Sequence, residues 1–183
     1  YPLRRQRQMC IRDRVSTAMS YFKQTIDGDI GTLEFDTPDS SVNILSSAAL
    51  TELEQQLDEI AGRSDIKVLL ITSAKKSIFI AGADIKEIES ITDPQEASEK
   101  CNRGKQVFDK LEKLPQITVA VINGACLGGG YELSLACTYR VAGFAGCVKI
   151  GLPEVRLGIL PGFGGCVRPV SYTHLTLPTK RIV

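Results

Sequence analysis

The sequence predicts an α/β fold in which strands and helices alternate along the chain. Short runs rich in β-branched residues, such as 66–72 and 119–122, are typical of strands. Longer segments with apolar residues at every third or fourth position, at 46–62 and 93–113, are typical of helices with one buried face. Because strands separated by helices favour βαβ units, we expect parallel strands packed against helices.

The first part of the chain is predicted to contain a strand, a helix and a second strand. Ile30–Phe35 alternates apolar and polar residues, as a half-buried strand does. Ser46 is a suitable N-cap for a helix that ends near Gly62. The apolar positions of this helix are Leu50, Leu53, Leu57 and Ile60. The next strand is expected at 66–72.

A short helix and a long helix are predicted next. The apolar pair Phe79-Ile80 leads into a loop of small residues, 81–84, and a short helix is expected over 85–91. Asp93-Pro94 begins the longer helix, which runs to about Lys113.

The stretch 119–137 is predicted to lie at the centre of the fold. A strand at 119–122, suited to burial on both faces, is followed by the consecutive glycines 128–130 and by a buried helix over 131–137. Glycines at a helix N-terminus allow close backbone approach and present N–H groups that can stabilise a negatively charged oxygen. Glu132 lies in the first helical turn, where the helix dipole favours a carboxylate. The alternative is a tight strand-to-helix turn with a surface glutamate.

Two other loops are candidates for chemistry. Small residues at 81–84 permit close approach to a ligand, although Asp84 could serve only as the N-cap of the next helix. Glu154 follows Pro153 after the strand expected at 148–151, so its position would be well fixed; a solvated glutamate is the alternative. Two glutamates near a backbone oxyanion site form a coherent set for proton transfer next to a carbonyl.

The two ends of the chain are predicted to be foreign to the fold. When residues 4–13 are translated back into DNA, the reverse complement of one codon choice encodes residues 170–179. One oligonucleotide read on opposite strands therefore accounts for both ends, and it looks like a transposon-end adapter from a sequencing library. We expect 1–14 and 170–183 to be non-native, and 15–169 to be one truncated domain.

Charge and hydropathy argue against several classes of protein. Without the two terminal segments, 15 basic and 20 acidic residues turn the net charge of +1 into −5. No basic stripe remains, so nucleic acid is not an expected partner. No apolar run approaches the ~20 residues that span a bilayer, and no targeting segment remains. We therefore expect a cytoplasmic protein with no membrane span.

The histidine and cysteine content restricts the chemistry. The only histidine, His174, lies in the non-native tail, which argues against Ser-His or Cys-His catalysis and against His-ligated metal sites. No metal site is expected. The cysteines of the domain are irregularly spaced, which favours free thiols in a reducing compartment. They are Cys101, Cys126, Cys137, Cys147 and Cys166. The nucleotide fingerprints GxxxxGK[ST] and GxGxxG are absent.

Three segments in order resemble the enoyl-CoA hydratase/isomerase, or crotonase, family. They are FIAGADIKEI at 79–88, NGACLGGGYELSLAC at 123–137 and GLPEVRLGILPGFGG at 151–165. The resemblance covers most of the chain from Ile30 to Arg168. It implies a crotonase-like fold of repeated ββα units, incomplete at the C-terminus. The amino-acid sequence of the third segment most resembles that of multifunctional members of the family that act in fatty-acid oxidation.

The resemblance also implies roles for individual residues. The backbone N–H groups of Ala83 and Gly129 correspond to the oxyanion hole of the family, and Glu132 and Glu154 correspond to its catalytic glutamates. Four residues are implied as substrate contacts: Ala81, Asp84, Ile85 and Gly128. The implied activity is addition of water to a 2-trans-enoyl-CoA, with isomerisation of 3-enoyl-CoA as an additional reaction of the same pocket.

The resemblance further implies cofactors and partners. No cofactor is expected in this chain, since coenzyme A is part of the thioester substrate; NAD would belong to a 3-hydroxyacyl-CoA dehydrogenase part outside it. The parent protein is expected to be oligomeric or paired with a thiolase subunit. Because the covering C-terminal helices are missing, we expect the chain to expose an apolar surface and to be poorly active.

Three other classes of protein are alternatives, and the third is the weakest. A non-catalytic acyl-CoA-binding subunit of the same fold would make Glu132 and Glu154 incidental. A serine peptidase of the related Clp-like fold would need a histidine base, which the domain lacks. A nucleotide-binding α/β domain is weaker still, because it would need one of the absent fingerprints.

Overall fold

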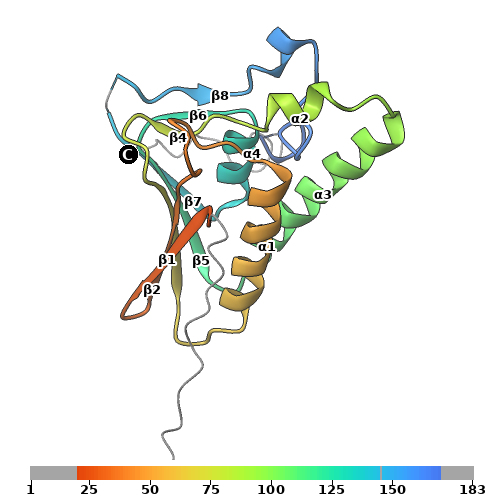
Figure 1. Cartoon of the computed structure of the whole chain (residues 1–183). Coiled ribbons are helices and arrows are strands. Elements are labelled where there is room, and N and C mark those ends of the chain that lie inside the picture. The colour runs from red at the N-terminus through yellow and green to blue at the C-terminus, as the bar shows by residue number, and fades with distance from the viewer. Residues whose placement is uncertain (1–19, 145, 170–183) are drawn as a thin grey trace, which may run out of the picture.

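The computed structural model of the chain describes residues 20–144 and 146–169 (Figure 1). The segments predicted to be non-native, 1–14 and 170–183, lie outside these residues. Within the described residues, no helix is both long and apolar enough to cross a membrane.

The chain builds successive units of two strands and a helical segment. The first unit holds β1 (Phe22–Asp27), β2 (Ile30–Phe35) and α1 (Ser47–Ala61), and the second holds β3 (Val68–Ser73), β4 (Ile78–Ile80), α2 (Ile85–Glu89) and α3 (Pro94–Glu112). The third holds β5 (Ile117–Ile122), β6 (Ala125–Leu127) and α4 (Gly129–Ala136). The last holds β7 (Tyr139–Ala142), β8 (Ile150–Gly151) and the 3-10 helix η1 (Glu154–Leu157). The predicted ββα repetition is therefore confirmed.

The strands form two sheets. The larger sheet has the order β1-β2-β3-β5-β7, in which β1 and β2 make an antiparallel hairpin and all other neighbours are parallel. The smaller sheet, β4-β6-β8, is entirely parallel. In the last three units, the first strand joins the larger sheet and the second strand joins the smaller one. This division brings the carboxyl ends of β4, β6 and β8 together.

Helices α1 and α3 pack against each other beside the larger sheet (Figure 1). Ser46 caps α1 through its side chain, which accepts a hydrogen bond from the Ala49 N–H, as predicted. The predicted apolar face of α1 is buried, and Leu50 at its start also lines the cavity described below. From α3 the core receives Val107, Phe108 and Leu111. On the sheet, Phe22 and Phe35 stack with ring centroids 4.6 Å apart.

A buried asparagine joins the two sheets. Asn43 is fully buried, and its Nδ2 group donates to the carbonyls of Phe35 at 2.8 Å and Phe79 at 3.2 Å. These acceptors lie at the end of β2 in the larger sheet and on β4 in the smaller one. The Oδ1 atom accepts from the Thr37 N–H at 2.8 Å, so both ends of the amide are bound.

The sequence-based element bounds differ from the structure at several points. Strands β1, β6 and β7 were not expected, because they are short or lack a strong alternating pattern. Helix α4 begins at Gly129, two residues before the predicted start, since the glycines belong to its first turn. The hairpin β1-β2 is antiparallel, in contrast to the parallel βαβ units that follow.

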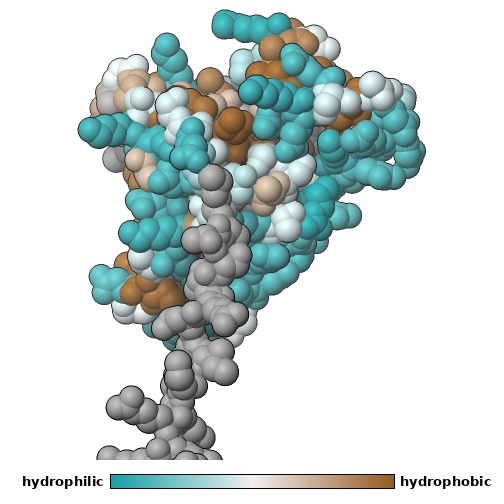
Figure 2. Space-filling view, in the orientation of Figure 1, coloured by the Kyte–Doolittle hydropathy of each residue, from teal (hydrophilic) through white to brown (hydrophobic). Residues whose placement is uncertain are grey.

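Apolar side chains are exposed at several places, among them Phe144 after β7 at 94% exposure, and two further regions are relevant to the fold and the site (Figure 2). One is the tip of the β1-β2 hairpin, with Ile26 and Ile30. The other lies on and after η1, where Val155 and Leu160 are each 82% exposed. An exposed apolar surface is what the sequence analysis expected.

Asn43→Ala should destabilise the fold by about 2 kcal/mol, because it leaves buried carbonyl and N–H groups without partners. Chemical denaturation at neutral pH measures this change in the free energy of unfolding. Asn102→Ala, at an exposed position of α3, is the matched control and should change it little. Equal effects of the two substitutions would contradict the role of Asn43 in joining the sheets.

Candidate active site

The three sequence motifs meet at the carboxyl ends of β4, β6 and β8. The loop 81–84 follows β4, Gly128 follows β6, and Glu154 follows β8 by three residues. Two hydrogen bonds hold β6 and β8 in register: Gly128 N–H donates to the Gly151 carbonyl at 3.0 Å, and Cys126 N–H donates to the Lys149 carbonyl at 2.8 Å. The three motifs, which are separate in the sequence, therefore lie close together in the structure.

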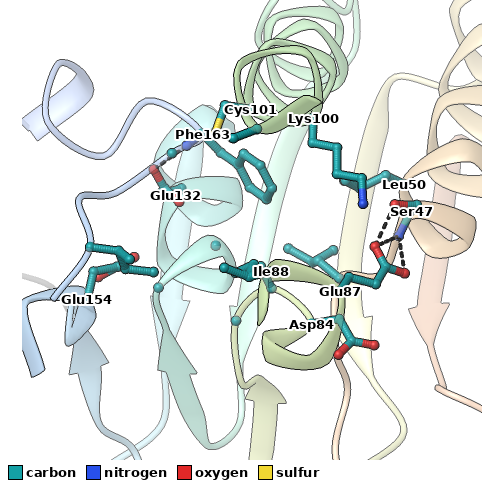
Figure 3. A pocket seen from close by; sticks show the side chains of 18 of the residues that line it. Ser47, Leu50, Asp84, Glu87, Ile88, Lys100, Cys101, Glu132, Glu154 and Phe163 are labelled. Carbon is teal, nitrogen blue, oxygen red and sulfur yellow. Dashed lines mark hydrogen bonds between the residues drawn. The ribbon is translucent and has the colours of Figure 1, made fainter. Parts of the chain in front are cut away.

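A cavity of about 370 Å³ opens at this cluster. Figure 3 shows Glu132 and Glu154 on one side of it, with Glu87 and Ser47 on the opposite side. Apolar side chains that line the cavity include Leu50, Ile88, Ile91, Ala97 and Phe163. The cavity therefore combines an apolar wall with a pair of carboxylates, which is the usual composition of a small-molecule site.

Glu132 is held by backbone amides from another part of the chain. Its side chain is buried, and Oε1 accepts hydrogen bonds from the N–H groups of Phe163 at 2.8 Å and Gly165 at 2.7 Å. Both bonds go to Oε1, so Oε2 has no hydrogen-bond partner within the described residues. The carboxylate is fixed by one oxygen and leaves the other available for a ligand or water.

The environment of Glu132 opposes its ionisation. Burial is the main cause that raises the pKa of this carboxyl, and the nearby charge of Glu154 raises it further. The two amide hydrogen bonds and the charge of Arg168 act in the opposite direction without cancelling the rise. A carboxyl with a raised pKa next to a second carboxylate is a common feature of proton-transfer sites.

Glu154 is also buried and lies against the glycine turn. Its Oε1 is 3.1 Å from the position that a Cβ atom would have at Gly128, and its buried Oε2 has no hydrogen-bond partner within the described residues. Gly128 has φ +53°, a conformation that side chains disfavour, so glycine is required there both for the turn and for the space.

The backbone nitrogen of Ala83 lies close to Gly129, the first residue of α4. The nitrogen of Ala83 is 3.5 Å from the position that a Cβ atom would have at Gly129. Gly129 is the first residue of α4, so its N–H has no partner within the helix. Neither N–H group makes a hydrogen bond within the described residues.

Close contact between α4 and β4 places this pair. A Cβ atom at Gly130 would lie 2.5 Å from the carbonyl oxygen of Ile80, so only glycine lets the first turn of α4 approach the end of β4. The residue after Ile80 begins the loop that carries Ala83. The glycine run therefore sets the separation between the two loops.

The other residues expected to contact substrate are distributed differently. Asp84 and Gly128 line the cavity, whereas Ala81 and Ile85 do not. The Asp84 carboxylate accepts a hydrogen bond from the Lys86 N–H at 2.9 Å and caps α2, which was the alternative role considered for it. Ala81 N–H donates to the Asn43 carbonyl, and Ile85 is 47% exposed.

The residues that hold Glu132 were not identified from the sequence. Phe163 lies in the third motif, but nothing in its spacing indicates that its N–H would reach α4. Arg168 donates to the Phe163 carbonyl at 2.8 Å and pairs with Asp109 of α3 at 2.6 Å. A glycine-rich loop after a motif glutamate is a weak signal for such a contact.

Residues 25–171 match the sequence model of the family described as Enoyl-CoA hydratase/isomerase. Similar curated proteins include the fatty acid oxidation complex subunits alpha of Aliivibrio fischeri, 46% identical over 143 residues, and Vibrio campbellii, 41% identical over 140 residues. These matches cover 78% and 76% of this chain but only 21% and 20% of the relatives. The chain thus spans about a fifth of their length.

Two solved structures are similar to the whole described fold. The enoyl-CoA hydratase from Geobacillus kaustophilus HTA426 matches with a TM-score of 0.79 and 33% identity, over 85% of this chain and 57% of that chain. The one from Bacillus anthracis matches with a TM-score of 0.76 and 33% identity, over 83% and 58%. The predicted crotonase-like fold is therefore confirmed.

Glu132→Gln should stabilise the fold at neutral and alkaline pH. A carboxyl whose pKa is raised by folding contributes stability below its ordinary pKa of 4.5, and this stability is lost as the pH rises through the folded-state value. Glutamine keeps an acceptor for the two N–H groups and carries no charge. We expect the variant to have a higher Tm than the wild type at about pH 8 and an equal Tm at about pH 4.

The control for this measurement is Glu59→Gln, an exposed position of α1 where Tm should change little at either pH. A Glu132→Gln variant that is less stable than the wild type at about pH 8 would contradict the raised pKa of this buried carboxyl.

Proposed function

Because the chain belongs to the enoyl-CoA hydratase/isomerase family, we propose that it catalyses the addition of water to 2-trans-enoyl-CoA thioesters. The observation that carries the proposal is the location of two buried glutamates, Glu132 and Glu154, in one cavity beside two backbone N–H groups that make no hydrogen bond within the described residues. The arrangement offers donors for the thioester oxygen and two carboxyl groups for the proton transfers.

The N–H groups of Ala83 and Gly129 would bind the thioester carbonyl oxygen. Negative charge develops on this oxygen as the C2–C3 double bond is attacked at C3. Donors fixed before the reaction stabilise that charge without reorganisation, and removal of one such donor in other acyl sites costs a factor of about 10²–10³ in rate. The close contact between Gly130 and Ile80 supports this assignment, because it keeps the two donors together.

The two glutamates would direct the addition of a hydroxyl group to C3 and of a proton to C2. Water held between the carboxylates gives its hydroxyl to C3 and one proton to Glu132, while protonated Glu154 gives a proton to C2. Proton exchange between the two carboxyls restores the starting state. Both hydrogen bonds of Glu132 go to its Oε1, and the buried Oε2 of Glu154 has no partner within the described residues; these observations support the roles, since each carboxyl keeps an oxygen that can contact the water.

Isomerisation of a 3-enoyl-CoA in the same cavity needs only proton transfer between C4 and C2. The cavity also suits the substrate class, because its apolar wall can accept an acyl chain. No metal or redox cofactor is needed in this scheme, since the thioester itself acidifies C2.

The relatives suggest the setting of the reaction. They are named as alpha subunits of a fatty acid oxidation complex, which favours a role in β-oxidation. Dehydrogenase activity with NAD, and pairing with a thiolase subunit, would belong to a longer protein of which this chain matches one part. A soluble, cytoplasmic location fits this role.

We expect the 183-residue chain to have low activity. The exposed apolar side chains after η1, Val155 and Leu160 among them, border the segment that carries Glu154. Because these side chains are exposed, this side of the cavity is open to water, which weakens electrostatic stabilisation in the site.

Glu132→Gln and Glu154→Gln should each lower the hydration rate of a short 2-trans-enoyl-CoA by roughly 10²–10⁴, the usual effect of losing a general acid or base. Loss of the enoyl-thioester absorbance measures this rate. Glu59→Gln should retain the wild-type rate, and binding of a saturated acyl-CoA should change little in all three variants.

Unchanged hydration in Glu132→Gln would exclude the proposed mechanism. A wild-type chain that binds acyl-CoA thioesters without accelerating hydration would instead support the alternative of a non-catalytic acyl-CoA-binding subunit.

A further inference from the structure

The backbone that binds Glu132 is itself held by a buried arginine. The donors to Glu132 belong to two peptide units, 162–163 and 164–165. The unit between them, 163–164, has its carbonyl oxygen bound by Nη1 of Arg168 at 2.8 Å. The guanidinium group of Arg168 thus fixes the central one of three consecutive peptide units, and the two peptide units that flank it bind the Glu132 carboxylate.

Arg168 is anchored in turn to α3. Its residue is only 9% exposed, Nη2 contacts Oδ1 of Asp109 at 2.6 Å, and Nε contacts Oε2 of Glu112 at 3.1 Å. The planar guanidinium therefore uses three different nitrogens for three partners, which a lysine ammonium at the end of a flexible chain cannot reproduce.

The space around Gly164 makes this arrangement specific. Gly164 has φ +109°, and a Cβ atom there would lie 2.2 Å from Nη1 of Arg168. The guanidinium packs directly on the backbone of the loop. The ring of Phe163 also attaches this loop to α3, with its centroid 5.5 Å from that of Phe108.

We propose that Arg168 is a positioning residue for Glu132: through the Phe163 carbonyl it holds the 163–165 backbone so that both N–H groups point at the carboxylate. The expected effect of Arg168 on kcat rests on the function proposed above, whereas its expected effect on the position and pKa of the Glu132 carboxyl does not.

The charged groups that act on Glu132 are few. Glu154, at the start of η1, raises the pKa of Glu132, and Arg168 lowers it. From α3, Asp109 and Glu112 pair with Arg168, and the thiol of Cys101 lines the same cavity. Removing the guanidinium therefore removes a positive charge and loosens two N–H donors, and both changes raise the pKa of Glu132.

The test compares Arg168→Met and Arg168→Lys with Arg140→Met in the full chain. Arg140 is the matched control because its guanidinium also binds backbone carbonyls near α4, those of Ser134 and Cys137, both at 3.0 Å. Two quantities are measured: the pKa of Glu132, by carboxyl ¹³C NMR titration assigned with Glu132→Gln, and the kcat and KM of hydration.

Arg168→Met should raise the pKa of Glu132 and lower kcat by roughly 10², the scale of a misplaced catalytic group, with KM changed less than about threefold. Arg168→Lys keeps the positive charge but loses the planar guanidinium that binds three partners. The pKa of Glu132 should therefore rise less than in Arg168→Met, while kcat still falls. Arg140→Met should lower Tm without changing the pKa of Glu132 or kcat.

A wild-type kcat in Arg168→Lys, together with a Glu132 pKa in Arg168→Met equal to that in Arg140→Met, would overturn the proposal. If Arg168→Met does not fold, Arg168→Lys decides by the same two readouts. A wild-type chain without hydratase activity would count against the proposed function alone, since the NMR titration still tests Arg168.

Discussion

The site depends on the burial of one carboxylate, Glu132, against backbone amides from a distant segment. The pKa of this group is raised by burial, so its ionised form costs stability and must be held by fixed donors. Phe163 and Gly165 supply these donors, and their loop is tied to α3. One oxygen atom of Glu132 therefore links the start of α4 to the loop after η1, and Arg168 links that loop to the end of α3.

Sheet topology explains why three separated motifs form one site. Each of the last three units sends its second strand into the smaller sheet, so the loops after β4, β6 and β8 emerge at the same edge. Ligand sites in parallel sheets commonly lie at the carboxyl ends of strands. Asn43 keeps that sheet attached to the larger one by bonding the carbonyls of Phe35 and Phe79. The hydrogen bonds of Asn43 therefore stabilise the contact between the sheets and also help to hold the strands that carry the site.

Sequence patterns predicted the parts of the structure that follow local rules. The cap at Ser46, the apolar face of α1 and the turn before α4 depend on neighbouring residues, and Glu132 and Glu154 were recognisable because each follows a strand-ending turn. The roles of Asn43 and Arg168 were not predictable, because their partners are distant backbone carbonyls that leave no periodic signal. Strand β6, three residues long, is too short for alternation to identify, whereas the two residues of β8 fall within the strand expected at 148–151.

The most direct test of the central claim is the ¹³C NMR signal of a bound thioester carbonyl. A saturated acyl-CoA labelled at C1 cannot be hydrated, so it reports on binding alone. If the Ala83 and Gly129 N–H groups donate to its oxygen, the carbonyl resonance should move downfield on binding, because hydrogen bonding withdraws electron density from the carbon. A saturating ligand whose carbonyl resonance stays at its free position would contradict the account.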